Sequence, residues 1–305
     1  MRNAELLIKG EELSAIIIPD EGALLSKLIW RERSVLACTP WSDSVVPQDL
    51  LATDENSWVK QWRGGWQLCA PTTGLPALNT AETAFHGAAS QSKWILENQK
   101  SNEAKFSWQS STGKIFISRR WVIGPGASIS VFNILHNRAS ENSEVFLAEH
   151  LILGGDLLGE LKTGESVVLI VPESSQLGLL DYAGYPSDIK LPWAEAKEDW
   201  GILNSDTPAR VSALIDPNPM QVIVQGKDWK ANISWQGLRH ALLWQEILQS
   251  QESPWDGAVL AFGIEPTSTP HGFGSTLGGG ITLNPDEKIE WGVTLSLTSS
   301  ELESV

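Results

Sequence analysis

Two histidines and one glutamate stand out in this 305-residue chain because of the short segments that contain them. His86 lies in FHGAAS, His150 in FLAEHLILGG and Glu265 in LAFGIEPTSTPHG. Imidazoles and carboxylates are the groups that most often transfer protons near neutral pH. The three residues are far apart in the sequence, so the fold must bring them together. The chemistry they predict is general acid–base catalysis.

The local sequence favours a functional role for two of these residues. His150 and its neighbour Glu149 should point to opposite faces of a strand, because successive side chains alternate. His150 would then project by itself toward a site on one face. Glu265 follows the apolar run AVLAFGI, and a carboxylate there fits a pocket better than a core, where an unpaired charge is costly. His136 is interpreted as structural, and His240 has little functional support.

Short β-strands would position these side chains. Runs rich in Val, Ile, Trp, Phe and Thr, which often alternate with polar residues, end at Gly, Pro, Asn or Asp. They predict strands at 14–18, 23–30, 105–109, 115–123, 128–135, 144–153, 167–171, 221–224, 231–235, 258–264 and 289–297. Residues 239–250 also favour a strand, and residues 49–61 a short helix or an irregular loop. This pattern predicts an all-β protein, a large β-sandwich formed by a single domain over residues 1–305.

Residues 181–219 form the least regular stretch of the chain, with five prolines at 186, 192, 208, 217 and 219. We expect a long surface excursion over the sandwich, and long loops of this kind often shape a binding site. A domain linker is the alternative, although no shift in composition follows the segment.

Composition excludes several classes of partner. The net charge of −15 disfavours nucleic acid and anionic membranes, which need a positive protein surface. An anionic small substrate stays open, because a local pocket can oppose the overall sign. Cys38 and Cys69 predict two reduced thiols, too few for a disulfide framework or a four-thiolate metal site. No segment resembles a signal peptide or a membrane span, so a cytoplasmic location is expected.

Tryptophan is unusually frequent, with 15 Trp against 7 Phe and 2 Tyr. Its broad apolar face suits the C–H faces of a pyranose, and its N–H adds one donor. Four tryptophans inside strand-like runs are expected in the core: Trp108, Trp121, Trp235 and Trp291. Three others, in segments interrupted by Gly or Pro, are expected to form pocket walls: Trp62, Trp66 and Trp255.

In their order along the chain, these segments resemble the galactose mutarotase (aldose 1-epimerase) family over nearly the whole sequence. IIIPDEGALLSKLIW is similar to the family's opening strands, WRGGWQLCAPTTG to the segment that enters the sugar site, and FHGAAS to the His-Gly motif. ISVFNILHNRASENSEVFLAEH resembles the strand–Asn–His pattern, FGIEP the Glu-Pro segment, and ITLNPDEKIEWGVTLSL the closing turn and last strand.

This resemblance implies a β-supersandwich with a sugar site on its concave face and no cofactor or metal. Glu265 would match the general base that takes the proton of the anomeric hydroxyl, and His150 the general acid that protonates the ring oxygen. His86 would match the second histidine, which binds and polarises the sugar near that oxygen. The ring opens to the aldehyde, the C1–C2 bond rotates, and reclosure gives the other anomer. Further candidates for substrate binding are Arg63, Gln67, Trp66, His271 and Lys93.

The chain departs from the family pattern at two places. Many catalytic members carry an Arg soon after His-Gly, whereas in HGAASQSKW the first basic residue is Lys93, which cannot form a bidentate Arg fork. The family site also commonly includes an Asp between the second His and the Glu, and no local motif selects one here. The candidates are Asp181, Asp188, Asp199, Asp206 and Asp228. These departures point away from classical galactose specificity and leave sugar binding intact.

The sequence therefore predicts an isomerase that interconverts the anomers of a hexose or hexose derivative, with a small-molecule sugar as its partner. One alternative is a non-catalytic carbohydrate-binding protein on the same fold. Another is an isomerase or lyase acting on a sugar phosphate or uronate, which a cluster of Arg63, Lys93 and Arg239 around one pocket would favour. A glycosidase normally needs a pair of carboxylates, and the sequence indicates only one. An exposed sheet would support a homodimer.

Overall fold

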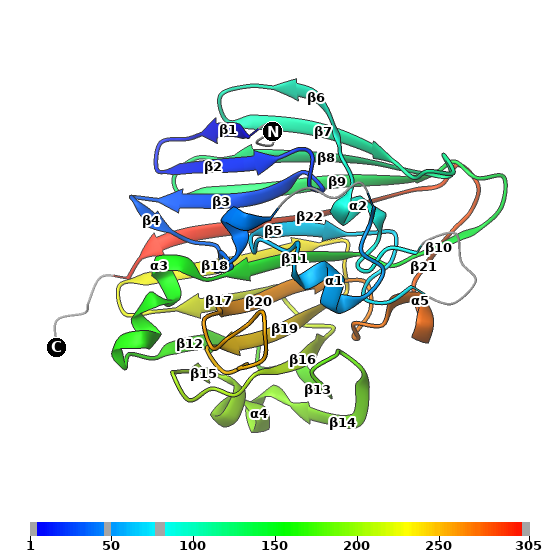
Figure 1. Cartoon of the computed structure of the whole chain (residues 1–305). Helices are drawn as coiled ribbons and strands as arrows, with labels where there is room; N and C mark the ends of the chain where they lie inside the picture. The colour runs from blue at the N-terminus through cyan, green and yellow to red at the C-terminus, as the bar shows by residue number, and fades with distance from the viewer. Residues whose placement is uncertain (1–4, 46–49, 77–82, 301–305) are drawn as a thin grey trace.

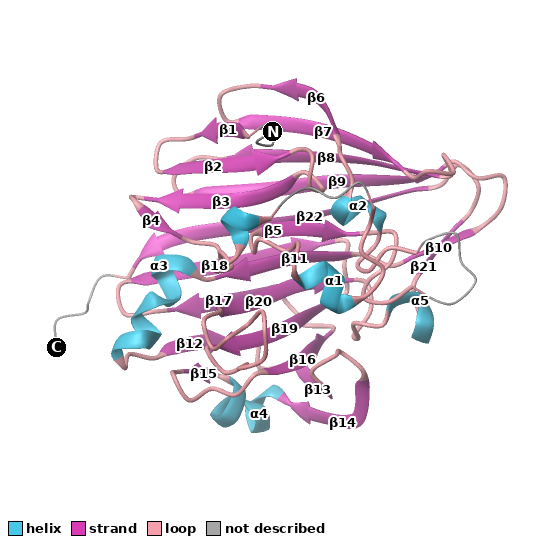
Figure 2. Ribbon diagram, in the orientation of Figure 1, coloured by secondary structure: helices cyan, strands magenta, loops and turns pink. Residues whose placement is uncertain are grey.

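Two large β-sheets packed face to face form most of the molecule (Figure 1). The computed structural model describes residues 5–45, 50–76 and 83–300. Strands predominate, and the helices are short segments in the connections between them (Figure 2). The predicted all-β sandwich is therefore confirmed.

The first sheet has 11 strands among the described residues. In spatial order they are β1 (Leu6–Lys9), β2 (Leu13–Ile18), β3 (Leu24–Trp30), β5 (Trp66–Cys69), β11 (Ala148–Leu153), β20 (Leu260–Thr267), β19 (His240–Ile247), β16 (Arg210–Ile215), β13 (Gln176–Leu180) and β14 (Pro186–Pro192), with β4 (Arg33–Ser34) paired to β3. The central strands come from distant parts of the chain, so residues far apart in sequence become neighbours there.

The second sheet has nine strands among the described residues. Their spatial order is β15 (Ile202–Leu203), β12 (Val167–Ile170), β17 (Gln221–Gln225), β18 (Trp229–Gln236), β22 (Lys288–Ser299), β9 (Ser128–Asn137), β8 (Ile115–Ile123), β7 (Glu103–Gln109) and β6 (Ile95–Gln99). A two-stranded ribbon joins β10 (Ser143–Val145) to β21 (Ile281–Leu283). In β8 and β9 buried residues alternate with more exposed ones, as expected for strands with one face in the core.

The α-helices are α1 (Glu55–Val59), α2 (Ala88–Gln91), α3 (Gly155–Leu158), α4 (Trp193–Trp200) and α5 (Gly274–Leu277), and short 3-10 turns cover Ser42–Ser44 and Gly159–Thr163. Figure 1 shows α1 and α2 in front of the first sheet, over the region of β5 and β11. None of the described helices is long and apolar enough to cross a membrane.

One hydrophobic core fills the space between the sheets. It includes Leu25 and Phe262 from the first sheet and Phe106 and Val293 from the second, all essentially inaccessible to solvent. A second, smaller cluster covers the other face of the first sheet and contains Trp58, Trp62, Phe85, Ile152 and Ala261. The first sheet is therefore covered on both faces, and the smaller cluster is the layer in which a pocket forms.

A fully buried ion pair joins the two sheets through the main core. The Arg119 guanidinium of β8 donates to both carboxylate oxygens of Glu149 on β11, at 2.8 and 2.9 Å. Glu149 also accepts hydrogen bonds from Asn133 and from the indole N–H groups of Trp66 and Trp291. Because five donors surround this carboxylate, its charge is compensated inside the core.

Most predicted strands are present, and two segments require correction. The predicted strand at 144–153 is two strands, β10 and β11. The irregular stretch at 181–219 contains β14, α4, β15 and β16, and is more ordered than a surface loop. Of the segment at 49–61, residues 55–59 form helix α1, and residue 49 lies outside the described residues. The predicted strand within 239–250 is β19, His240–Ile247.

Candidate functional site

The site is built on a row of side chains that crosses the first sheet. Leu151 of β11 lies opposite Ile264 of the antiparallel strand β20, and the next pair in this register is His150 with Glu265. On the other side of β11, Gln67 of β5 lies opposite His150. Because residues that face each other across antiparallel strands point to the same side, this row shares one face of the sheet.

That face is the one turned away from the second sheet. Glu149 points into the core between the sheets, so the next residue, His150, points out of it. This confirms the alternation predicted from the sequence. His150 and Glu265 reach a cavity of about 150 Å³, which His86 also lines. Three residues predicted to act together, from positions 86, 150 and 265, therefore meet in one pocket.

His86 is held by two hydrogen bonds to Gly74. The His86 N–H donates to the Gly74 carbonyl at 2.9 Å, and the Gly74 N–H donates to His86 Nδ1 at 3.0 Å. Since Nδ1 accepts, the neutral ring must carry its proton on Nε2. The φ angle of His86 is 59°, unusual for a residue with a side chain, and Gly87 follows with φ of 77°. A Cβ at Gly87 would lie 2.1 Å from the Ala70 carbonyl oxygen, which explains the glycine after the histidine.

His150 lies among aromatic rings close to His86. The centroids of the two imidazoles are 5.6 Å apart, and Trp58 and Trp62 pack edge-on against the His150 ring at 5.7 and 5.8 Å. His150 Nδ1 and the Trp62 indole nitrogen are buried and have no hydrogen-bond partner among the described residues. Buried polar atoms are usually satisfied, so leaving these two without a partner carries a local cost in stability.

Glu265 lies beside His150, on the neighbouring strand β20. Its Oε1 is 3.9 Å from His150 Nε2, too far for a direct hydrogen bond. Gly263, two residues earlier on the same face, makes room for the carboxyl group. A Cβ at Gly263 would lie 2.5 Å from Glu265 Oε1. The glycine of FGIEP therefore leaves space for the glutamate.

Burial controls the protonation of all three groups. It raises the pKa of Glu265 to about 8 and lowers the pKa of His150 to about 4. The pKa of His86 is also well below its ordinary value, first because of burial and then because of the nearby His150. At neutral pH the pocket is thus lined by a protonated carboxyl group and two neutral imidazoles. The site contains one transferable carboxyl proton and a neutral imidazole able to receive it.

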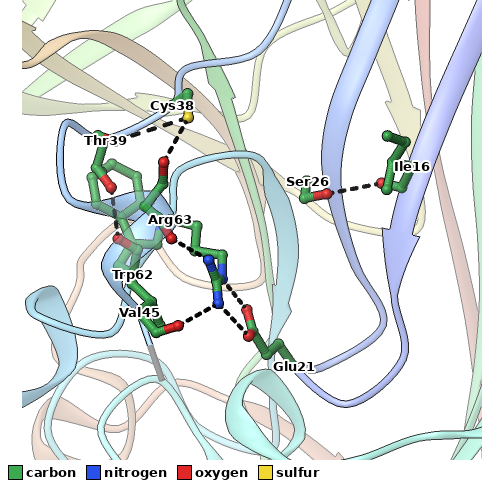
Figure 3. Close-up of polar contacts among 9 residues, drawn as sticks. Ile16, Glu21, Ser26, Cys38, Thr39, Val45, Trp62 and Arg63 are labelled. Carbon is green, nitrogen blue, oxygen red and sulfur yellow. Dashed lines mark hydrogen bonds and ion pairs between the residues drawn. The ribbon is translucent and has the colours of Figure 1, made fainter. Parts of the chain in front are cut away.

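The structure places Arg63 outside this pocket. Its guanidinium pairs with the Glu21 carboxylate at 2.7 and 3.0 Å and also donates to the backbone carbonyls of Ser42 and Val45 (Figure 3). The Arg63 side chain therefore fastens a loop beside the sheet. Gln67 is not among the described residues that line the pocket; together with Arg63 it lines a separate, smaller hollow of about 60 Å³.

The remaining candidates for substrate binding also lie elsewhere. Trp66 is fully buried between the sheets, where its indole N–H donates to Glu149. Lys93 is largely exposed and pairs with Asp20 at 2.9 Å. His271 accepts from the Phe273 N–H, and its Nε2 lies 3.1 Å from the Gly278 carbonyl oxygen, so it holds its own loop together. None of these three is among the described residues that line the pocket.

The aromatic wall was only partly visible in the sequence. Trp62 and Trp255 line the pocket as predicted, and Trp108, Trp121, Trp235 and Trp291 lie in the core as predicted. Five aromatic wall residues were missed: Trp58, Phe85, Tyr182, Trp244 and Phe273. Trp244 is on a strand, and Tyr182 belongs to the segment predicted to cover the site. None of the five candidate aspartates is among the described lining residues.

The described residues include no cluster of three or more His, Cys, Asp or Glu side chains placed to hold a metal ion. The polar groups that project into the pocket are instead suited to hydrogen bonding and proton transfer with an organic ligand.

The fold is similar to several solved structures over nearly its whole length. The Slr1438 protein from Synechocystis sp. PCC 6803 is 15% identical, with a TM-score of 0.73 and coverage of 98% of this chain and 97% of that chain. The GalM/aldose epimerase homologue from C. elegans is 12% identical, with a TM-score of 0.71 and coverage of 98% and 100%. A galactose mutarotase-like protein from Lactobacillus casei ATCC 334 is 13% identical, with a TM-score of 0.67 and coverage of 97% and 100%.

No protein-family model matches the sequence, and no curated protein matches it. The structural similarity shows that this chain has the galactose mutarotase-like fold, as the sequence motifs predicted. At these identities the similarity concerns the fold, and the function must be argued from the site.

Proposed function

We propose that this protein is an isomerase of the aldose 1-epimerase type, which interconverts the α and β anomers of a hexose or hexose derivative. The observation that carries this proposal is the pairing of His150 and Glu265, 3.9 Å apart inside an aromatic pocket with His86 beside them. The fold supports the same proposal, because related folds occur in proteins described as mutarotase-like.

The reaction needs one proton removed and one delivered. Glu265, as carboxylate, takes the proton of the anomeric hydroxyl O1, and His150, as imidazolium, gives a proton to the ring oxygen O5. The C1–O5 bond breaks as the C1–O1 double bond forms, and rotation about C1–C2 precedes reclosure. Burial keeps the carboxyl group of Glu265 protonated at neutral pH, so its proton must first pass to His150. A sugar hydroxyl bound in the gap between the two groups provides a path for it.

His86 and the aromatic wall bind the sugar in this proposal. With Nδ1 occupied by the Gly74 N–H, His86 offers its Nε2–H as a donor to an oxygen of the sugar. The faces of Trp58 and Trp62 suit the C–H surface of a pyranose. Positioned acid and base groups supply on the order of 10²–10⁴ in rate, a useful gain for a reaction that also proceeds unaided.

The positions of the basic residues favour this proposal over a sugar phosphate or uronate enzyme. Such an enzyme was expected to gather Arg63, Lys93 and Arg239 around one pocket. Each instead forms an ion pair elsewhere, with Glu21, Asp20 and Asp216 respectively, as the distances of 2.7, 2.9 and 2.9 Å show. No lysine or arginine is among the described residues that line the pocket.

Anomeric exchange followed by NMR tests the proposal. Native protein should speed the exchange of at least one free sugar, and Glu265→Gln should reduce that acceleration about 10²-fold or more. Glu290→Gln, which changes an exposed glutamate of β22 on the other sheet, should keep the native rate. Binding of sugars without any acceleration would instead identify a non-catalytic carbohydrate-binding protein.

A further inference from the structure

The base of the pocket is polar on one side and apolar on the other. The row that contains His150 and Glu265 continues to Leu242 of β19, which lies opposite Glu265. In the adjacent row, Val211 of β16 lies opposite Trp244 of β19. Leu242, Val211 and Trp244 all line the pocket. Beyond Glu265, a ligand therefore lies over aliphatic and indole surface.

Two residues that line the pocket, Trp244 and Tyr182, form hydrogen bonds within the protein. The Trp244 indole N–H donates to the Tyr182 hydroxyl oxygen at 3.4 Å, and the Tyr182 O–H donates to Glu246 at 2.9 Å. Glu246 is buried and also accepts from the Ser250 hydroxyl at 2.6 Å. Both donors of the pair formed by Trp244 and Tyr182 are thus already used within the protein.

The proposed function places O1 of the sugar at Glu265 and O5 at His150. In that pose a carbon of the sugar next to Glu265 would face Leu242 and Val211, because Leu242 lies opposite Glu265 and both side chains line the pocket. A hydroxyl on that carbon would leave water without gaining a partner from those two side chains. Burying an unpaired hydroxyl is unfavourable, whereas a C–H group at the same place gains apolar contact.

We propose that the natural ligand is a deoxysugar, a neutral sugar with hydrogen in place of the hydroxyl on the carbon that faces Leu242 and Val211. This inference rests on the proposed function of the same pocket and specifies its substrate class. An apolar site rejects an analogue that merely adds a hydroxyl by about 10²-fold. We therefore expect a preference of about 10–100-fold for the deoxysugar over its hydroxylated parent.

A panel of matched sugars tests the inference. Glucose and galactose are each compared with their 2-deoxy and 6-deoxy analogues, and every kcat/KM is divided by the spontaneous rate of the same sugar. At least one deoxy analogue should exceed its parent about tenfold or more, and its position identifies the carbon that faces the apolar side. Parent sugars that react as well as both analogues would overturn the inference.

Binding separates this inference from the proposed function. Dissociation constants for the same panel, measured by saturation-transfer NMR, should show the same preference for a deoxysugar. If deoxysugars bind more tightly but no sugar exchanges faster, the ligand class stands and the mutarotase function fails. If exchange is fast but shows no preference, the function stands and the ligand class is wrong.

Two substitutions at one position give a matched control. Val211→Thr adds a hydroxyl at nearly constant shape, and Val211→Ala only removes methyl groups. Val211→Thr should lower the preference for the deoxysugar severalfold by giving the parent sugar a partner, whereas Val211→Ala should affect both sugars alike. Circular dichroism checks that each variant is folded. An unchanged ratio in a folded Val211→Thr protein would contradict the inference.

Discussion

His150 and Glu265 carry one proton between them over a wide pH range. The pKa of His150 is lowered to about 4 and that of Glu265 is raised to about 8, in both cases by burial. Below the first value both groups are protonated and no base is left. Above the second value neither group holds a proton and no acid is left. Only between the two values does the pair contain one acid and one base.

We therefore expect a bell-shaped pH dependence of kcat/KM, with limbs near pH 4 and pH 8. The measurement is anomeric exchange across this range, with the spontaneous rate subtracted at each pH because acid and base catalyse the free reaction. A rate that still rises well above pH 8 would show that an ionised Glu265 alone limits the reaction, and would rule out the shared proton.

The meeting of His86, His150 and Glu265 in one pocket was predictable because each residue lies in a segment with its own local pattern. For the other candidates the sequence reveals a chemical type but not its partner. Arg63 is neutralised by Glu21, 42 residues earlier in the chain. In the segment WRGGWQ, Trp62 lies in the loop after α1 and enters the pocket, whereas Trp66 is the first residue of β5 and enters the core. Long-range pairing of this kind leaves no local signal.

Helix α1 illustrates how a short element controls the site. Its Trp58 packs edge-on against the rings of both His86 and His150, with centroid distances of 4.6 and 5.7 Å. The helix has only five residues, and Asp54 caps it by accepting hydrogen bonds from the Ser57 N–H and hydroxyl. So short a helix depends on its cap and on tertiary contacts.

Removing this cap should loosen the wall of the pocket without touching the acid–base groups. We expect Asp54→Ala to raise KM severalfold while kcat changes little. Asp54→Asn keeps an acceptor at the cap and should resemble native protein. Steady-state exchange kinetics and hydrogen exchange of the α1 amides provide the two readouts. An equal effect of both substitutions would show that the cap is not the cause.

The β-strands were predictable from the sequence where one face of the strand is buried and the other is more exposed. β8 and β9 alternate between buried and more exposed residues, and their positions follow from the sequence. β14 was missed because it begins and ends with Pro186 and Pro192, which are tolerated at the edge of a sheet. The boundary between β10 and β11 was also missed, because the apolar run through Val145 and Leu147 conceals the break between the two strands.

In the whole molecule, the hydrophobic core stabilises a fold whose pocket carries a cost in stability. The main cluster spans both sheets, and the ion pair of Arg119 and Glu149 connects them directly behind His150. The pocket, in contrast, buries Glu265 with no lysine or arginine among the described lining residues, and buries His150 with its Nδ1 unpaired within the part of the chain that the structure describes. Such local costs persist only where the surrounding structure is stable enough to hold them, and they are typical of functional sites.

Because Glu265 is buried, the free energy of unfolding should depend on pH. Folded protein keeps the proton of Glu265 up to a pKa of about 8, whereas the unfolded chain releases it near the ordinary value of 4.5. The stabilising contribution is therefore fully present below pH 4.5 and is lost as pH rises toward about 8, by at most about 1.4 kcal/mol per pH unit.

Glu265→Gln removes this titration, so its free energy of unfolding should gain on that of native protein as pH rises from 4.5 to about 8, and the difference should then become constant. Urea unfolding at several pH values measures the difference directly, and Glu290→Gln serves as the control for an exposed glutamate. A difference that does not change with pH would mean that Glu265 is already ionised in the folded protein, and the proton needed for ring opening would then have to come from elsewhere.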